Sequence, residues 1–300
     1  MKKTKILFIK LGYSETLDSE IGRVVSLGDV LRTTPVVEAI KDKYKNSHLT
    51  WLVSREAEPL LNNNPYIDRV IVWDEFTPFQ LLMEKFDLMI NLEKIPGVCA
   101  IGDKIEAWNK YGFRFNSDTG NYDGYEQGLE FIDYINQKEI NCNRHDYWQK
   151  TIIEMLGLKW KEQQYTLGYK PKNKPINEIG LNYKVGNKWP EKAMSEKKWK
   201  NLECKLLDLG YSISWQKGLN SLEEYFEWIN SCEMIISQDS LGLHLALAMK
   251  KKLIGLFGPT PSSEIFFTKE SIVIESKTNK MKDIKINDII DGVQKLFKNK

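Results

Sequence analysis

Residues 233–260, EMIISQDSLGLHLALAMKKKLIGLFGPT, hold the pattern that decides the fold. Glu233–Ser237 and Lys252–Phe257 are short apolar runs that predict buried strands, and Leu241–Met249 between them predicts a helix. A strand, a helix and a strand joined by short links are typical of a parallel sheet covered by helices. This segment therefore predicts an α/β fold.

The same alternation continues on both sides of this segment. A capping box at Ser221–Glu224 predicts one helix start, and Thr34-Pro35 predicts another, with proline in the first helical position. Residues 93–150 are rich in aromatic, Gly and Asn residues and are expected to be irregular, with short helices. The other expected strands are Lys5–Ile9, His48–Val53, Arg69–Trp73, Phe86–Leu92, Glu178–Asn182 and Tyr211–Trp215, and the other expected helices are Glu58–Asn62, Tyr147–Leu156, Glu196–Leu209 (capped by Ser195, with Gly210 after it) and Ile286–Phe297.

The pattern stops and restarts once, which divides the chain. Pro171–Pro175 (PKNKP) is the best linker candidate. We therefore expect two doubly wound α/β domains, residues 1–170 and 171–300, that face each other across a cleft. The last helix could pack back on the first domain. Ligands of such sheets bind at the carboxyl ends of the strands.

The composition limits the classes of function. The chain has 300 residues, is 42% hydrophobic and carries a net charge of +2, which indicates real cores and argues against a dedicated nucleic-acid binder. Its longest apolar runs are far shorter than the roughly 18 residues that span a bilayer. The four cysteines form no CxxC pair and only three histidines occur, so a zinc site or a disulfide framework is not expected. Reduced thiols favour a cytoplasmic protein.

Three segments at predicted strand ends could carry chemistry. The first is SLGDVLRTTP (26–35), where Gly28 allows a close backbone approach and Asp29 would present a carboxylate at the mouth of the cleft. An alternative is that Asp29 only caps a helix. In the second, KWPEKAMS (188–195), Lys188 and Lys192 precede a helix N-terminus, where an anion would find ammonium charge and free N–H groups. A solvated surface is the alternative for these lysines.

The third segment is SQDSLGLH (237–244). Asp239, Ser240 and backbone amides would form a polar pocket, and Ser240 and His244 share a helix face. No G-x-S-x-G motif occurs, which argues against a nucleophilic serine. Thr260 ends the next strand. The absence of G-x-G-x-x-G after the first strand and of a P-loop disfavours a dinucleotide oxidoreductase and a P-loop NTPase.

Together these segments resemble glycosyltransferase family 9, the bacterial heptosyltransferases of lipopolysaccharide synthesis. SLGDVLRTTPVVEAI (26–40) is similar to the family's N-terminal signature and SQDSLGLHLALAMKKKLIGLFGPT (237–260) to its C-terminal signature. NPYIDRVIVWD (64–74) and FDLMINLEK (86–94) follow at familiar spacing. The resemblance implies a GT-B fold of two Rossmann-like domains, with the acceptor on the first and the nucleotide sugar on the second. It also implies inverting transfer without a metal, usually from ADP-heptose.

The resemblance also implies roles for individual residues. Asp29 is the expected base that removes the acceptor proton, and the leaving diphosphate is expected to meet Lys192, Ser240 and helix N–H groups. Asp239 is expected to orient backbone amides or bind sugar hydroxyls. His244 would contact phosphate or pack within its helix. The other expected positions are Lys188, Gly242 and Thr260 on the donor side and Ser26, Gly28 and Arg32 on the acceptor side.

The sequence departs from the family pattern at four places. Residues 11–25 separate the first strand from the SLGD segment, and the loop Gln216–Asn220 lacks the family's glycine-rich stretch. The family's Lys-x-Trp-Pro fits two registers. Lys192 keeps the distance to Trp199, whereas Lys188-Trp189-Pro190 keeps Trp-Pro. We favour Lys192. The family's Asp-Ser-Gly becomes Asp239-Ser240-Leu241-Gly242.

Two other functions remain open from the sequence. One is a catalytically silent nucleotide-sugar binding protein, and the other is a GT-B sugar-nucleotide epimerase. The expected partners are a nucleotide-sugar donor and a glycan or glycolipid acceptor, with no nucleic acid. Weak contact with the inner face of the cytoplasmic membrane is also expected, through lysines near the cleft and Lys295, Lys298 and Lys300 at the C-terminus.

Overall fold

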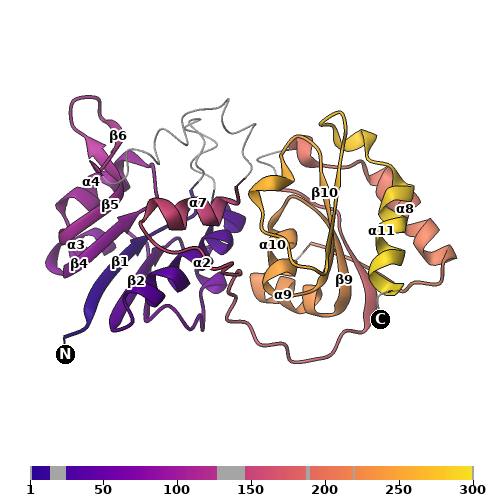
Figure 1. The fold of residues 1–300 in the computed structure, drawn as a ribbon, viewed down its shortest axis with the longest axis horizontal. Coiled ribbons are helices and arrows are strands. Elements are labelled where there is room, and N and C mark those ends of the chain that lie inside the picture. Colours follow the sequence, from indigo (N-terminus) through magenta and orange to yellow (C-terminus); the bar gives the residue numbers. More distant parts are fainter. Residues whose placement is uncertain (1, 14–24, 127–145, 187–189, 219, 299–300) are drawn as a thin grey trace. The chain divides into compact units, whose positions relative to one another are not determined.

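The computed structural model describes residues 2–13, 25–126, 146–186, 190–218 and 220–298. The chain divides into two compact units, residues 1–168 (unit 1) and 169–300 (unit 2) (Figure 1). Each unit contains one sheet with helices against it.

Unit 1 is built on a six-stranded sheet in the order β3-β2-β1-β4-β5-β6. All neighbouring pairs are parallel except β5 and β6. After β1 the chain adds β2 and β3 on one side and then crosses to β4 on the other side. The topological switch point therefore lies between β1 and β4. The strands are β1 (Thr4–Ile9), β2 (Ser47–Val53), β3 (Arg69–Val72), β4 (Lys85–Asn91), β5 (Glu106–Asn116) and β6 (Asn121–Gly124), and the helices are α2 (Leu27–Lys43), α3 (Thr77–Met83), α4 (Pro96–Lys104) and α7 (Trp148–Met155), with a 3-10 helix at Glu58–Leu60.

The helix start predicted at Thr34-Pro35 is wrong. Helix α2 begins at Leu27, and Pro35 lies inside it. Proline has no N–H for the carbonyl one turn before it. The Thr34 hydroxyl donates to that carbonyl, Leu31 O, at 2.7 Å, and so replaces the missing hydrogen bond. The proline is therefore tolerated, and the SLGD segment becomes the first helical turn.

The prediction of irregular structure over residues 93–150 is also wrong in part. The two strands β5 and β6 form a hairpin there, with Phe113 opposite Gly124. Most residues of β5 are exposed or half-buried, so the strand has no continuous apolar run to mark it. The predicted helix at the end of this region is present as α7, which ends before Gly157 in the left-handed conformation (φ +64°).

Unit 2 contains a five-stranded, fully parallel sheet in the order β11-β10-β9-β7-β8. Its switch point lies between β7 and β9. The strand, helix and strand predicted for residues 233–260 are confirmed. The elements are β7 (Asn177–Asn182), β8 (Ile213–Trp215), β9 (Cys232–Gln238), β10 (Lys252–Phe257), β11 (Ser271–Glu275), α8 (Glu196–Asp208), α9 (Leu222–Asn230), α10 (Leu241–Ala248) and α11 (Ile286–Lys298), with 3-10 helices at Pro190–Lys192, Ser262–Glu264 and Met281–Asp283.

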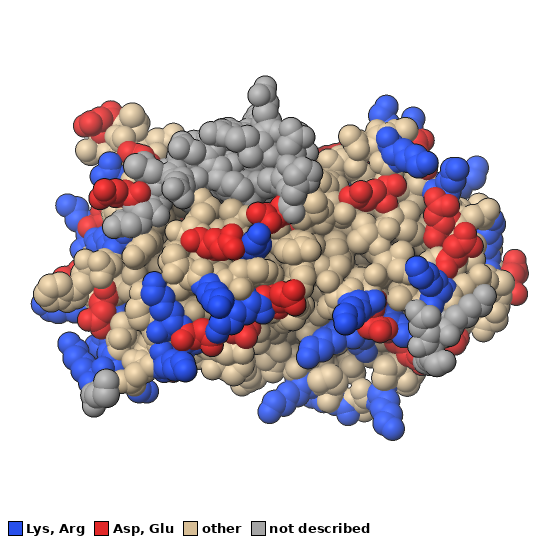
Figure 2. All heavy atoms as spheres, in the orientation of Figure 1, with Lys and Arg blue, Asp and Glu red and all other residues tan. Residues whose placement is uncertain are grey.

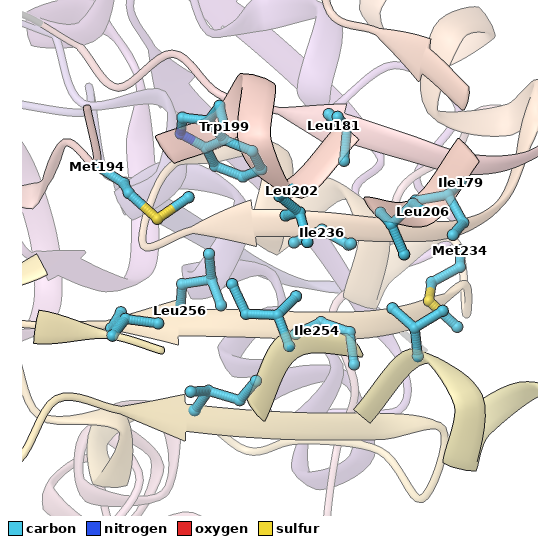
Figure 3. Close-up of a cluster of buried hydrophobic side chains, with 14 of the residues drawn as sticks. Ile179, Leu181, Met194, Trp199, Leu202, Leu206, Met234, Ile236, Ile254 and Leu256 are labelled. Carbon is cyan, nitrogen blue, oxygen red and sulfur yellow. The ribbon is translucent and has the colours of Figure 1, made fainter. Parts of the chain in front are cut away.

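The core of unit 2 lies between the sheet and helices α8 and α11 (Figure 3). Trp199 and Leu202 of α8 contact the buried side chains of β7, β9 and β10 in one cluster. Helix α11 completes the cluster with Ile289 and Val293. This packing holds the sheet rigid and fixes the loops that follow the carboxyl ends of its strands.

Candidate active site

Polar residues meet at the switch point of unit 2, where β7 and β9 end side by side. Asn182 is the last residue of β7, and Ser237 and Gln238 end β9. Asn182 pairs with Ser237 in the sheet register. Switch points at the carboxyl edge are where open α/β sheets bind their ligands, so this edge is the candidate site of unit 2.

Asp239 is the centre of a charged cluster at this edge. Its Oδ2 accepts hydrogen bonds from Lys192 Nζ at 2.5 Å and from Thr260 Oγ1 at 2.9 Å. His244 Nε2 lies 4.0 Å from Asp239 Oδ1. The side chains of Lys192 and Asp239 are 16% and 15% exposed. The ion pair is therefore partly open to solvent and accessible to a ligand.

The electrostatics of Asp239 follow from these contacts. Burial favours the neutral carboxyl and raises its pKa, but the charges of Lys192 and His244 and the hydrogen bonds from Lys192 and Thr260 outweigh it. The pKa of Asp239 is therefore held below its ordinary value, and the group is ionised at neutral pH. The carboxylate holds the Lys192 ammonium in place at the edge of the sheet.

A second network surrounds Ser240. Asn182 Nδ2 donates to Ser240 Oγ at 2.9 Å and to Ser237 Oγ at 2.8 Å, and Tyr225 OH donates to Asn182 Oδ1 at 2.5 Å. A Cβ at Gly242 would collide with both Asn182 and Tyr225, so only glycine lets α10 approach β7 this closely. The network joins β7, β9, α9 and the start of α10.

Ser240 is the N-cap residue of α10, yet its side chain makes no capping hydrogen bond. Its hydroxyl accepts from Asn182 instead. The N–H groups at the start of a helix have no partner within the helix. The side chain of Ser240 does not occupy these groups, of which Leu243 N–H donates to Ser240 O at 3.0 Å, and the helix dipole favours an anion at this end.

Gln238 fixes the segment that carries Lys192. Its Nε2 donates to Tyr183 O at 2.8 Å, and its Oε1 accepts from the backbone N–H of Met194. Gln238 is fully buried. One side chain at the end of β9 therefore holds both the residue that follows β7 and the residue two positions after Lys192.

In unit 1 the predicted acceptor-side residues lie together at the start of α2. Ser26 is the N-cap residue, so Asp29 is not the cap that the alternative interpretation required. Asp29 Oδ1 lies 3.2 Å from Arg32 Nε, and the Arg32 guanidinium stacks over the Trp148 ring with its Cζ 4.5 Å from the ring centroid. Arg32 thus connects the Asp29 carboxylate to helix α7.

A buried ion pair closes the switch point of unit 1. Lys10 follows β1 and Glu93 follows β4, with Lys10 Nζ 3.5 Å from Glu93 Oε1 and side chains 0% and 1% exposed. Glu93 Oε1 also accepts from Gly12 N at 2.8 Å, and Gly12 O accepts from Ser26 N at 2.5 Å. The pair therefore sets the position of the first turn of α2.

The structure brings the predicted residues together in two groups, one in each unit. In unit 2, Lys192, Asp239, Thr260 and His244 form one cluster, and Ser240 and Gly242 meet at Asn182. His244 is 5% exposed and packs beside Asp239. In unit 1, Ser26, Gly28, Asp29 and Arg32 lie within seven residues at the start of α2. Lys188 lies outside the described residues, so the choice between the two lysine registers stays a prediction.

Five residues of these networks were not predicted from the sequence: Asn182, Tyr225 and Gln238 in unit 2 and Lys10 and Glu93 in unit 1. Four of the five carry the same signal, a polar residue at the last position of an apolar strand or just after it. Tyr225 carries none, because it lies within helix α9 and away from any strand end. Among the described residues no group of three His, Cys, Asp or Glu side chains is arranged to hold a metal ion. In that part of the chain no helix is long and apolar enough to cross a bilayer.

Comparison with known proteins defines the class of this fold. The structure matches the glycosyltransferase family 9 protein of Veillonella parvula DSM 2008 with a TM-score of 0.72 at 16% identity, over 100% of this chain and 99% of that one. It matches E. coli heptosyltransferase WaaC with ADP-2-deoxy-2-fluoro heptose with a TM-score of 0.66 at 14% identity, over 97% and 99% of the two chains. These likenesses confirm the predicted GT-B fold.

Sequence comparison agrees with the fold. The family model described as glycosyltransferase family 9 (heptosyltransferase) matches residues 217–294. Lipopolysaccharide heptosyltransferase 1 of Campylobacter coli is 26% identical over 326 aligned positions, which cover 93% of this chain and 90% of that protein. The predicted resemblance to glycosyltransferase family 9 is confirmed, and the protein is a glycosyltransferase.

Proposed function

We propose that the protein transfers a heptose from ADP-heptose to a hydroxyl of a lipopolysaccharide core or another surface glycan, with inversion and without a metal ion. The name of the Campylobacter coli relative supports the acceptor class. The ADP-heptose analogue named with WaaC supports the donor class. The observation that carries the proposal is the Lys192–Asp239–Thr260 cluster beside the start of α10 at a switch point.

The diphosphate of the donor would bind at this cluster. Lys192 supplies a cation, Ser240 a hydroxyl, and the first turn of α10 supplies N–H groups. Negative charge grows on the diphosphate as the sugar leaves, and preorganised cations and N–H groups stabilise that charge without reorganising. Because the Lys192 ammonium is held by Asp239 before any ligand arrives, little rotamer entropy is lost when the diphosphate binds. These groups would stabilise the charge of the diphosphate, as a metal ion does in other enzymes.

Asp29 would act as the base in a single displacement at the anomeric carbon. An acceptor hydroxyl must lose its proton as it attacks, and a carboxylate in hydrogen-bond reach can accept that proton. Arg32 fixes the orientation of the Asp29 carboxylate, and the stacking on Trp148 fixes Arg32. A lipid-linked acceptor would place the reaction at the inner face of the cytoplasmic membrane.

The test is a screen of donors followed by a transfer assay on the full chain. Native mass spectrometry with ADP-heptose and other nucleoside-diphosphate sugars should show binding of the ADP sugar first. Incubation with a lipopolysaccharide core acceptor and EDTA should still give product, with inverted configuration by NMR. Donor binding without transfer to any core acceptor would instead favour the silent binding protein. A product of unchanged anomeric configuration would exclude the inverting mechanism.

A further inference from the structure

Helix α3 of unit 1 carries apolar side chains on its outer face. Phe76, which precedes the helix, and Phe79 and Met83 within it are 69%, 70% and 85% exposed, and Leu82 is 39% exposed. The inner face is also apolar, since Leu81 is fully buried in the unit 1 core. Phe76, Phe79 and Met83 recur at the spacing of one helix face. We name these four outward side chains the α3 patch.

The α3 patch is a concentration of apolar surface rather than an isolated exposed side chain. Elsewhere in the part of the chain that the structure describes, the exposed large hydrophobic residues are Trp108, Ile176, Leu207 and Leu209. Single exposed apolar residues are ordinary, whereas a contiguous group marks an interaction surface. Four such side chains within eight residues of sequence therefore indicate an interaction surface.

Cationic side chains lie at the C-terminal end of the α3 patch. Lys85 follows the helix by two residues and is 76% exposed, and its strand lies beside β1, which begins after the exposed Lys2 and Lys3. Glu84 has a lowered pKa because Arg69 donates to it, and the charge of Lys5 contributes. Lysine and arginine side chains gather at the end of unit 1 where the N-terminus lies (Figure 2).

The charges at this end sum to an excess of cations. The carboxylates there are engaged, since Glu84 pairs with Arg69, Glu106 pairs with Lys85, and Asp87 accepts from the backbone N–H of Lys5. Lys2, Lys3 and Lys5 add three ammonium groups. An apolar stripe with cations at one end is a pattern that binds an anionic membrane surface, with apolar side chains among the acyl chains and lysines at the headgroups.

We propose that the α3 patch docks unit 1 on a lipid bilayer that contains anionic lipids. The area argues against a second copy of the chain. A fully buried aromatic residue contributes about 150–250 Å², so the patch offers on the order of 500 Å², less than the about 800 Å² per partner of a stable interface. A bilayer sets no such lower limit of area, because it takes up single side chains, and its negative charge suits the cations at the C-terminal end of the patch.

This docking surface differs from the lysine contacts expected from the sequence. Those contacts would vanish at high salt, since exposed charges are screened. The apolar side chains of the α3 patch are not screened, so part of the binding should survive high salt. The binding is a property of the surface and does not depend on the proposed sugar transfer.

Co-sedimentation of the full chain with vesicles tests this proposal. Vesicles of phosphatidylcholine with phosphatidylglycerol should sediment the wild-type protein, and high salt should weaken the binding without abolishing it. The double variant Phe79→Ser/Met83→Ser should bind at least about tenfold more weakly, because each side chain removed is a large apolar group. The variant Ile176→Ser removes an exposed apolar side chain of unit 2 and should bind like the wild type. Melting temperatures of all variants verify that they fold.

Three results would overturn the proposal. The wild-type protein could fail to sediment with the phosphatidylcholine–phosphatidylglycerol vesicles. The double variant could bind vesicles as tightly as the wild type does. Finally, sedimentation equilibrium could show a wild-type dimer that becomes a monomer on Phe79→Ser/Met83→Ser, in which case the occupant of the patch is a second copy. A charge-reversed variant, Lys2→Glu/Lys3→Glu, should lose only the salt-sensitive part of the binding.

Discussion

Each unit has an ion pair between a lysine and a carboxylate at its switch point, but the two pairs differ in how far their side chains are exposed to solvent. In unit 1, Lys10 and Glu93 are at most 1% exposed, and Glu93 also holds the backbone of Gly12. In unit 2, Lys192 and Asp239 are 16% and 15% exposed, and they lie at the end of the 3-10 helix Pro190–Lys192 and directly after β9. The first pair has no room for a ligand between its partners, whereas the second can present its lysine to one.

This difference in exposure indicates that the first pair has a structural role and the second pair a role in ligand binding. A fully buried pair costs several kcal/mol per ion in desolvation, and removal of one partner leaves the other as an uncompensated buried charge. The Lys10–Glu93 pair therefore belongs to the framework that places the first turn of α2, where Asp29 lies. The Lys192–Asp239 pair is itself the proposed contact surface.

The largest effect is expected for Asp29→Asn in unit 1. The amide keeps the size of the carboxylate but not its basicity, so turnover should fall by about 10²–10⁴-fold. Affinity for ADP should be unchanged, because the donor groups lie in unit 2. The control is Asp42→Asn near the far end of α2, which loses an exposed pair with Lys161. Turnover near that of the wild type would show that unit 1 contributes no base at this position.

The next effect is expected in stability rather than catalysis. Glu93→Gln leaves the buried Lys10 ammonium without its carboxylate, and the free energy of unfolding should fall by about 3–5 kcal/mol. The double variant Lys10→Met/Glu93→Gln should lose less, since no buried charge remains. Urea unfolding measures both values, and Glu106→Gln, which breaks an exposed pair, should cost at most about 1 kcal/mol. Equal losses for Glu93→Gln and Glu106→Gln would remove the distinction between the two switch points.

Lys192→Ala should show the opposite pattern. The loss of one charge-assisted contact to the leaving diphosphate costs about 2–4 kcal/mol in the transition state, or about 30- to 1,000-fold in turnover. The melting temperature should change little, because the pair is partly exposed. Lys200→Ala removes an exposed pair of α8 in the same unit and serves as the control. If Lys188→Ala costs more than Lys192→Ala, the Trp189-Pro190 register is the correct one.

A smaller effect is expected for Tyr225→Phe. The change deletes the hydroxyl that orients the Asn182 amide and, through it, Ser240. One hydrogen bond contributes about 0.5–1.5 kcal/mol, so ADP should bind about 2- to 10-fold more weakly by calorimetry. Ser214→Ala removes the acceptor of the Trp228 indole on the same helix and is the matched control. Equal losses of ADP affinity in both variants would mean that the Asn182 network has no particular role.

The smallest effect concerns acid pH. The pKa of Asp239 is lower in the folded protein than its ordinary value of about 3.9. Its ionised form therefore adds stability that is complete above about pH 4 and is lost as the pH falls through the lower folded value. The gap in unfolding free energy between wild type and Asp239→Asn should be constant near neutrality and shrink below about pH 4. A gap that widens on acidification would contradict the lowered pKa.

The sequence predicted the α/β alternation well because the central strands of both sheets are buried on both faces and appear as continuous apolar runs. It failed at β5, whose residues are mostly exposed, and at Pro35, where the Thr34 hydroxyl replaces a backbone hydrogen bond. The site was found where the signal is local, since Asp239 and Ser240 join a strand end to a helix start. Glu93 and Tyr225 were not found, because each acts on a residue more than 40 positions away in the sequence.

The contiguity of the two units has a consequence for how the protein is made. All six strands of unit 1 come from residues before 169, so its sheet and the Lys10–Glu93 pair can form while unit 2 is still on the ribosome. Synthesis of the remaining residues at about 5–20 per second takes on the order of ten seconds. During that interval the nascent chain exposes the α3 patch with no donor half attached. A chain that meets the membrane during synthesis could therefore be placed there before it is able to bind a nucleotide sugar.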